Sequence, residues 1–222
     1  MEGTPQDYGR SLESQAKMLR EASEFEAKSA DQPARDMYCR GLLLRTADLV
    51  GSCSLFVEPA HVVAGQVLMR SMLEDLIKVL WATLAESHAE NLSTSGLDQL
   101  KLMMRANLQG GTARIIDKHG NDHSERFMRD GKLAPSGKKK TVEAMAKEAG
   151  AEGLYNMFYR FASMQTHGNS LNSPVTITPT DVSAVLSGIG AIAKATGHTS
   201  IRWLLCRKRP GSKELLDLLG IR

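Results

Sequence analysis

Two residue types that can cleave RNA without a metal ion stand seven positions apart, Arg160 and His167. Seven residues advance an α-helix by nearly two turns, so both side chains would share one helix face, about 10 Å apart along the axis. Arginine keeps its charge and forks onto phosphate oxygens, whereas histidine takes or gives a proton near neutral pH. The spacing predicts a catalytic pair. The alternative is a structural helix, with the Arg in a salt bridge and the His near the C-terminal end, where the helix dipole favours it.

A second pair of charges, Arg70 and Glu74, stands four positions apart in the most apolar segment of the chain, residues 60–88. Apolar residues cover most of the circumference of the helix expected there, which predicts a central, buried helix. Buried charges need partners, because an unpaired one is strongly destabilising. Glu74 is a natural partner for Arg160 or for Arg70 and would then support the catalytic pair. The alternative is an internal bridge between Arg70 and Glu74 alone.

Two basic clusters flank these helices and form the candidate RNA-binding surface. They comprise Lys138, Lys139 and Lys140 in one segment and Arg202, Arg207, Lys208 and Arg209 in the other. A net charge of +3 and a sequence pI near 8.8 permit a polyanionic partner. Runs of charge are also common on ordinary solvated surfaces, and that alternative stays open.

Two other patterns are better explained by structure than by ligand binding. The string at 188–193 matches the dinucleotide spacing G-x-G-x-x-A, but no strand precedes it, and small residues inside an amphipathic helix allow close packing. His119 and His123 have the spacing of metal ligands on a helix, but the intervening Gly120 and Asn121 favour a polar loop. We therefore expect no metal and no other cofactor.

The composition indicates a helical protein outside the membrane. Of the 222 residues, 42% are hydrophobic and only 5% aromatic, with 11 methionines, a balance that favours helices over strands. The three cysteines form no C-x-x-C pair, which indicates a reducing compartment. The polar N-terminal residues contain no apolar signal segment. We expect a cytoplasmic protein with no membrane partner.

Helical periodicity predicts an all-α bundle of five to seven helices in a single domain, residues 1–222. The expected helices cover residues 8–30, a segment from Pro33, 60–88, 97–118, 141–149, 154–167, and a segment opened by the Thr178–Asp181 capping box that would end near Gly197. Residues 117–140 hold seven Lys or Arg against four Asp or Glu, and we expect a mobile basic excursion there. A basic tail is expected from about residue 202.

The candidate site resembles the HEPN superfamily, all-helical nucleotide- and RNA-binding domains with an Arg-x(4–6)-His motif. The sequence is most similar to a bacterial branch of unknown function that combines two short motifs. Arg-x-x-x-Glu on a long helix is here Arg70 and Glu74; Tyr-Arg-x-x-Ser-x-x-x-His is here Tyr159, Arg160, Ser163 and His167. The resemblance spans roughly residues 38–202.

This resemblance implies a core of four or five helices, a homodimer that brings two Arg/His pairs together, and a metal-independent endoribonuclease with Arg160 and His167 as catalytic residues. Many such proteins are toxins or abortive-infection effectors against phage, so an antitoxin or another defence protein is an implied partner. Catalytic members usually carry a polar residue after the motif arginine, where this chain has Phe161. The alternative is an inactive helical module that binds RNA, a nucleotide or a protein. A purely structural oligomer is a third, weaker hypothesis.

Overall fold

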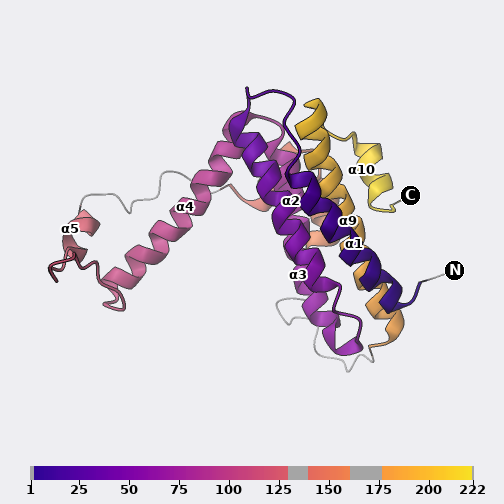
Figure 1. Cartoon of the computed structure of the whole chain (residues 1–222), viewed down its shortest axis with the longest axis horizontal. Helices are drawn as coiled ribbons and strands as arrows, with labels where there is room; N and C mark the ends of the chain where they lie inside the picture. Colours follow the sequence, from indigo (N-terminus) through magenta and orange to yellow (C-terminus); the bar gives the residue numbers. More distant parts are fainter. Residues whose placement is uncertain (1–2, 130–139, 161–176, 222) are drawn as a thin grey trace.

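The computed structural model describes residues 3–129, 140–160 and 177–221 (Figure 1). Within these ranges the chain is helical and contains no strand; one isolated antiparallel bridge joins Ile116 and Asp122. The elements are, in chain order, α1 (Pro5–Ser23), α2 (Pro33–Cys53), the 3-10 helix η1 (Pro59–His61), α3 (Val62–Ala82), α4 (Glu86–Gln109), α5 (Ser124–Arg129), α6 (Val142–Glu148), α7 (Glu152–Leu154), the π-helix η2 (Tyr155–Tyr159), α9 (Pro179–Cys206) and α10 (Ser212–Leu218). The predicted all-α helical bundle is confirmed.

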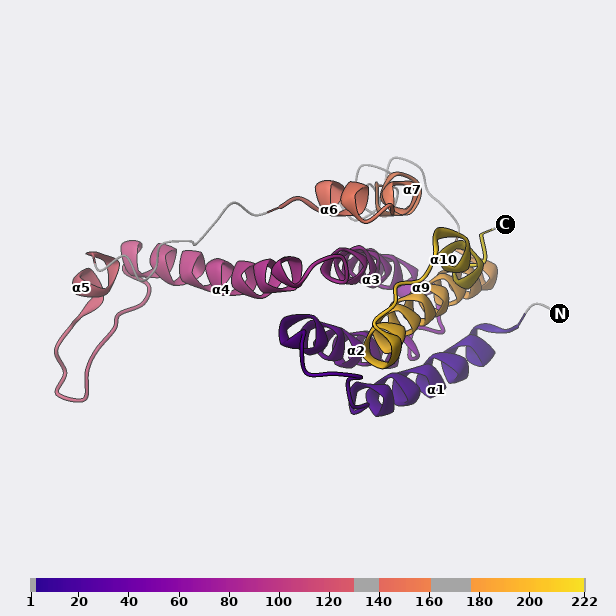
Figure 2. The same ribbon diagram turned by 90° about the horizontal axis from the view of Figure 1, so that it is seen from above.

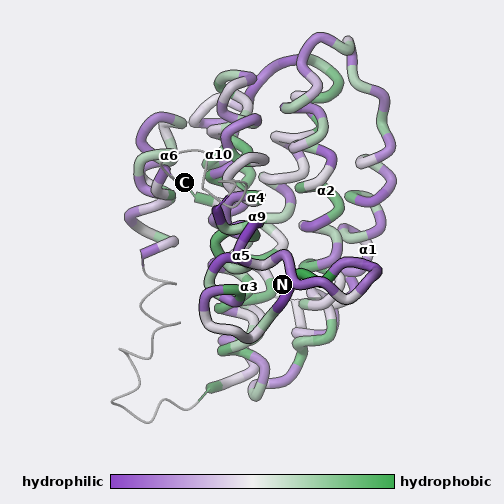
Figure 3. Tube along the Cα trace, turned by 90° about the vertical axis from the view of Figure 1, so that its left-hand side faces the viewer, coloured by the Kyte–Doolittle hydropathy of each residue, from purple (hydrophilic) through white to green (hydrophobic). Residues whose placement is uncertain are grey.

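Four long helices, α1, α2, α3 and α9, form the bundle that contains the core (Figure 2). Helix α9 packs against each of the other three. Their inward residues are mostly aliphatic, and hydrophobic and hydrophilic residues alternate along each helix (Figure 3). The largest fully buried side chains include Leu12, Leu43, Leu76, Ile189 and Leu204. Burial of one face of each helix is the main stabilising contribution in such a bundle.

Helix α9 begins as the sequence predicts but ends later. The Asp181 carboxylate accepts hydrogen bonds from the backbone N–H (2.8 Å) and the hydroxyl (2.7 Å) of Thr178, which closes the predicted capping box. The expected end near Gly197 is wrong, because the helix continues to Cys206. A β-carbon at position 197 would lie 2.5 Å from Cδ2 of Leu19, so the glycine serves the close approach of α1 to α9.

The first expected helix is too long. Helix α1 ends at Ser23, and the residues that follow form a connector to α2. In this connector the Lys28 N–H donates to the Leu204 carbonyl at 2.8 Å, near the C-terminal end of α9. Local periodicity cannot predict this long-range bond. The bond holds the connector in a non-helical conformation.

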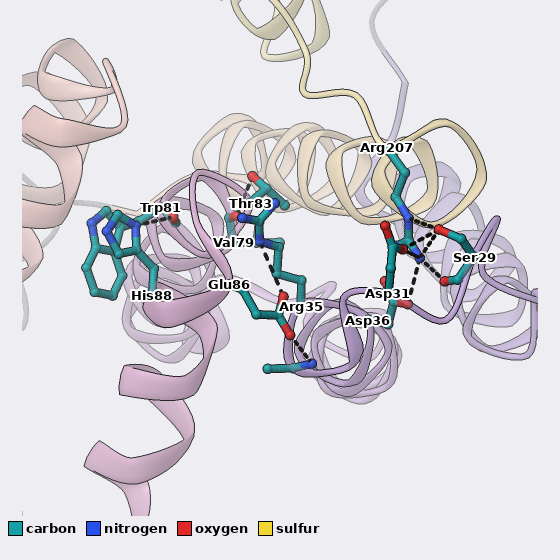
Figure 4. A network of polar contacts seen from close by, with 11 residues as sticks. Ser29, Asp31, Arg35, Asp36, Val79, Trp81, Thr83, Glu86, His88 and Arg207 are labelled. Carbon is teal, nitrogen blue, oxygen red and sulfur yellow. Dashed lines mark hydrogen bonds and ion pairs between the residues drawn. The ribbon is translucent and has the colours of Figure 1, made fainter.

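The expected helix over residues 60–88 is two helices. Helix α3 ends at Ala82, where the Thr83 hydroxyl donates to the carbonyls of Val79 (2.9 Å) and Leu80 (3.1 Å). Helix α4 starts at Glu86, whose carboxylate accepts from the Ala34 N–H at the start of α2 at 2.6 Å (Figure 4). The expected helix over 97–118 therefore starts eleven residues earlier, and it ends at Gln109, before Gly111 with its positive φ of 70°.

Helix α4 leaves the bundle as an arm that carries a hairpin and α5 at its far end (Figures 1 and 2). At its base, the His88 ring stacks on Trp81 with centroids 4.2 Å apart (Figure 4). Residues 117–129, the first half of the expected basic excursion, form the second half of the hairpin and α5, while residues 130–139 lie outside the described residues. The mobility expected for the whole excursion stays a prediction.

None of the described helices combines the length and the apolar character that crossing a membrane requires.

Candidate functional site

Arg160 follows directly after a π-helical turn. Its backbone N–H donates to the Tyr155 carbonyl, an i→i+5 bond, and the turn includes Tyr159. An i→i+5 bond widens the turn, so the residues four and five positions after Tyr155 both lie near its side chain. In an ordinary α-helix of 3.6 residues per turn, Arg160 would lie farther around the helix.

The widened turn assembles two arginines and two tyrosines, which we call the cation–aromatic cluster. The Arg70 guanidinium, from α3, lies 4.9 Å from the centre of the Tyr159 ring. The Tyr159 ring stacks on Tyr155 at 5.2 Å, and the Arg160 guanidinium lies 5.7 Å from the centre of the Tyr155 ring. Each cation is attracted to the negative face of its ring. The cluster therefore links the two predicted motifs directly, through Arg70 and Tyr159, and Tyr155 connects Tyr159 to Arg160.

A polar chain runs along one side of the cluster. Arg70 Nη2 donates to the Tyr159 hydroxyl at 2.8 Å, and this hydroxyl donates to Glu74 Oε2 at 3.3 Å. Burial raises the pKa of Glu74, but hydrogen bonds from Lys78 and Tyr159 and the charge of Arg70 outweigh it, so the net shift is downward. Burial and the Glu74 charge raise the pKa of Tyr159. Glu74 is thus an ionised acceptor and Tyr159 a neutral donor at neutral pH.

Glu74 forms an ion pair with Lys78 instead of the expected pair with Arg160 or Arg70. Glu74 Oε1 lies 2.6 Å from Lys78 Nζ one turn further along α3, and Tyr159 separates the carboxylate from Arg70. Glutamate followed by lysine at i+4 is the favourable order on a helix. Arg70 and Glu74 are also half-buried rather than enclosed in the core.

Arg70 keeps one donor unused. Its Nε is buried and has no hydrogen-bond partner in the part of the chain that the structure describes. Arg160, in contrast, is solvent-exposed. The cluster therefore presents one exposed cation, Arg160, and one half-buried cation, Arg70, with a buried Nε donor that is unused.

The second catalytic candidate, His167, lies outside the described residues, as do Phe161 and Ser163. Lys138 and Lys139 of the first basic cluster lie outside them too. The expected helix over 154–167 is observed only up to Arg160, with its π turn.

Lys140 points toward the bundle rather than into solvent. Its Nζ pairs with Glu148 and lies 5.2 Å from the centre of the Trp81 ring. The Trp81 indole N–H donates to Glu148 at 2.5 Å, so α6 is tied to the end of α3. These contacts hold the half-buried Lys140 against α3 and α6 at the surface of the protein.

Three of the four basic residues near the C-terminus also have partners within the chain. Arg202 pairs with Glu214 of α10, and Arg209 donates to the Ala149 carbonyl at 3.1 Å. Burial lowers the pKa of Arg209. Lys208 is exposed. The segment expected as a basic tail instead folds back and includes α10.

Of these basic residues, Arg207 has the most partners among the described residues (Figure 4). Its guanidinium binds both carboxylate oxygens of Asp36, bonds to the Ser29 carbonyl, and lies 3.5 Å from Asp31. Hydrogen bonding to Asp36 raises the pKa of Arg207. The residue has a positive φ of 57°, unusual for a residue with a side chain. We call this set of contacts the Arg207 clamp, and it joins the α1–α2 connector to the end of α9.

The two sequence patterns that were attributed to structure rather than to ligand binding are the G-x-G-x-x-A string and the His119/His123 pair. They lie in a helix and in a loop, as expected. The glycines at 188 and 190 are inside α9, next to Met69 and Leu12. His123 lies in the hairpin of the arm, where its Nε2 is 3.0 Å from Asp117. Within the described residues, no three potential ligands gather closely enough to hold a metal ion.

Two residues of the site were missed. The sequence alone does not predict the contact of Tyr155 with Arg160, because an α-helical register does not place these residues side by side. Only the π turn brings them together. Lys78 could have been found, since it follows Glu74 at i+4.

The described residues thus define an all-α bundle with a cluster of arginines and tyrosines on α3 and the π turn. Residues 36–176 match a family of unknown function, DUF5677, and the chain belongs to this family. The matched range contains all four residues of the cation–aromatic cluster as well as Glu74 and His167. No curated protein and no solved structure matches the chain.

Proposed function

We propose that this protein is a metal-independent endoribonuclease of the HEPN type, acting as a homodimer in a toxin or phage-defence system. The observation that carries the proposal is the cation–aromatic cluster, which leaves Arg160 exposed beside Tyr155 while Arg70 and Tyr159 fix the turn behind it. A fixed, exposed arginine is suited to bind a phosphate, and an aromatic neighbour is suited to contact a base.

In the proposed reaction, a ribose 2′-hydroxyl attacks the adjacent phosphorus. The new bond joins O2′ to phosphorus while the bond to O5′ breaks, so the products are a 2′,3′-cyclic phosphate and a 5′-hydroxyl. His167 takes the proton from O2′ or gives one to O5′, and Arg160 balances the charge on the phosphate oxygens. Two His residues of a dimer would supply a base and an acid together.

A second candidate is a helical module that binds RNA without cleaving it. It is favoured by the surroundings of Arg160, whose guanidinium contacts an aromatic ring among the described residues rather than an acid or a base. Phe161 follows in the sequence. Stacking of bases on tyrosine and arginine requires no proton transfer.

A cleavage assay separates the two candidates. The full chain is incubated with pooled RNA in EDTA, next to Arg160→Ala, His167→Ala and the distant control Arg10→Ala, an exposed arginine of α1. The endoribonuclease predicts cyclic-phosphate ends from the wild type and the control, and loss of cleavage in both site variants. Equal cleavage by His167→Ala contradicts it. Binding without cleavage, weakened by Arg160→Ala alone, supports the second candidate.

A further inference from the structure

The four side chains of the cation–aromatic cluster lie in series, with a cation at each end and the two rings between them. Arg70 lies over Tyr159, which stacks on Tyr155 with an interplanar angle of 20°. Arg160 lies over the Tyr155 ring. The two ends differ in exposure, because Arg70 is half-buried and donates to the Tyr159 hydroxyl, whereas Arg160 is solvent-exposed. Arg160 is therefore the end of the series that a ligand can reach.

The two rings are largely engaged within the chain. Tyr159 is only 9% exposed, and its ring contacts Arg70 and Tyr155. Tyr155 is half-buried, and its ring contacts Tyr159 and Arg160. For a base that approaches from solvent, the Arg160 guanidinium is consequently the most accessible planar group of the series.

The charge of Arg160 is left for a ligand. In the part of the chain that the structure describes, no carboxylate pairs with its guanidinium, which lies over the Tyr155 ring instead. Glu74, the acid that borders the cluster, uses Oε1 for Lys78 and Oε2 for the Tyr159 hydroxyl. A free guanidinium favours a ligand that carries both negative charge and electron-rich rings, as a nucleotide does.

A guanidinium can contact a nucleotide in two directions at once. Its face stacks on aromatic rings, whereas its N–H donors lie in the plane of the group and fork onto phosphate oxygens. Stacking therefore leaves the phosphate contact of the proposed reaction available. The bases of single-stranded RNA can be splayed out and present a face to the protein, whereas the bases of a duplex are covered by their neighbours in the stack.

We propose that Arg160 recognises single-stranded RNA by stacking on an unpaired base, with Tyr155 as the positioning residue that holds the guanidinium. This inference rests on the proposed function for the identity of the ligand, RNA, but it requires no cleavage. A surface that binds RNA through charge alone would also bind a duplex or a strand without bases. Dependence on the base is thus the property that sets stacking by Arg160 apart from general attraction to a polyanion.

Fluorescence anisotropy with a labelled 2′-O-methyl RNA strand tests this dependence. The methyl group blocks the attacking hydroxyl, so the probe stays intact whether or not the protein is an endoribonuclease. The wild type is expected to bind the single strand at least about tenfold more tightly than an abasic strand of equal length or the same strand in a duplex. Equal affinities in either comparison, or no binding of the single strand, would overturn the proposal.

Arg160→Lys keeps the positive charge but removes the planar group. This variant should bind the intact strand about tenfold more weakly than the wild type and should no longer distinguish it from the abasic strand. Tyr155→Leu should also weaken binding of the intact strand, because the guanidinium loses the ring that holds it. Binding of the intact strand by Arg160→Lys with the affinity of the wild type would overturn the proposal.

Two matched controls lie outside the cluster. Arg10→Lys makes the same exchange at an exposed arginine of α1. Phe158→Leu removes an aromatic ring from the same turn, where Phe158 is 37% exposed. Both variants should bind the intact strand as the wild type does, and a loss in both equal to that of Arg160→Lys would contradict a specific role of Arg160.

The outcomes separate this inference from the proposed function. Cleavage of unmodified RNA by a wild type that binds intact and abasic strands equally contradicts base recognition alone. Base-dependent binding by a wild type that leaves unmodified RNA intact contradicts the endoribonuclease alone. Circular dichroism checks that the variants are folded, and the comparison of intact and abasic strands with the wild type decides the matter if Arg160→Lys is not.

Discussion

Tyr159 is the residue on which the cation–aromatic cluster depends. Its hydroxyl lies between Arg70 and Glu74, and its ring contacts both Arg70 and Tyr155. One side chain thus supports two interactions of different kinds. The polar interaction and the ring contact can be separated by removing the hydroxyl alone.

We predict that Tyr159→Phe lowers the free energy of unfolding by about 1–2 kcal/mol, because Arg70 and Glu74 lose the group that bridges them. Urea unfolding measures the change. Tyr155→Phe is the control, since it keeps the stacked ring, and no hydrogen bond of the Tyr155 hydroxyl is seen among the described residues. Equal losses in both variants would show that the bridging hydroxyl contributes nothing specific.

At the scale of elements, two helices come into contact where a small residue leaves room or where polar side chains form hydrogen bonds between them. Gly197 lets α1 approach α9, and the Glu148 carboxylate joins α6 to α3 through Trp81 and Lys140. Neither contact follows from the periodicity of one helix. Each can be tested by changing one residue at the junction.

Gly197→Ala is expected to destabilise the protein by about 1–3 kcal/mol. The new methyl group would overlap Leu19, and this overpacking outweighs the gain in helix propensity of up to about 1 kcal/mol. Gly41→Ala in α2 is the matched control, because a β-carbon there meets nothing within 4 Å and only the propensity gain remains. Thermal unfolding should show opposite shifts; a stabilised Gly197→Ala would contradict the close packing of α1 and α9.

The attachment of α6 should depend on pH. Hydrogen bonds from Lys140 and Trp81 lower the pKa of Glu148 below its ordinary value of 4.5. A carboxyl group whose pKa is lowered on folding stabilises the fold above its unfolded pKa, and this contribution is lost as the pH falls through the folded pKa. Tryptophan fluorescence should therefore change as the solution is acidified below pH 4.5.

Glu148→Gln is the control for this titration. An amide does not ionise, so the part of the fluorescence change that belongs to Glu148 should be missing from the variant. Identical acid titrations of the variant and the wild type would contradict the assignment.

For the whole molecule, the Arg207 clamp connects segments that are far apart in the sequence. The connector at Ser29 and the start of α2 at Asp36 are both held to the end of α9 (Figure 4). Both charged side chains of the Arg207–Asp36 pair are nearly buried, at 13% and 11% exposure. A buried pair of this kind is costly to break, because the remaining charge has no partner.

We predict that Arg207→Ala lowers the free energy of unfolding by about 3 kcal/mol. Lys208→Ala, which removes the exposed neighbouring charge, should change it by less than about 0.5 kcal/mol. Chemical denaturation compares the two. A loss of RNA binding in Arg207→Ala without any loss of stability would instead support the role first expected from the basic cluster.

Local chemistry was sufficient to predict much of the architecture. Apolar spacing predicted the all-α bundle and the helix from Pro33, and the Thr178–Asp181 capping box predicted the start of α9. These features depend on residues within a few positions of one another. The motif residues Arg70, Glu74, Tyr159 and Arg160 were also identified from the sequence, although their mutual contacts were not.

Only the tertiary structure decided which charges meet and where helices stop. Tyr159, which is far along the chain, separates Glu74 from Arg70, and the π turn brings Tyr155 beside Arg160. Arg207 was expected to bind RNA but is bound to Asp36, a residue distant in the sequence. Charge patterns in a sequence show which groups need partners, but the choice among partners depends on packing between distant segments, which periodicity does not encode.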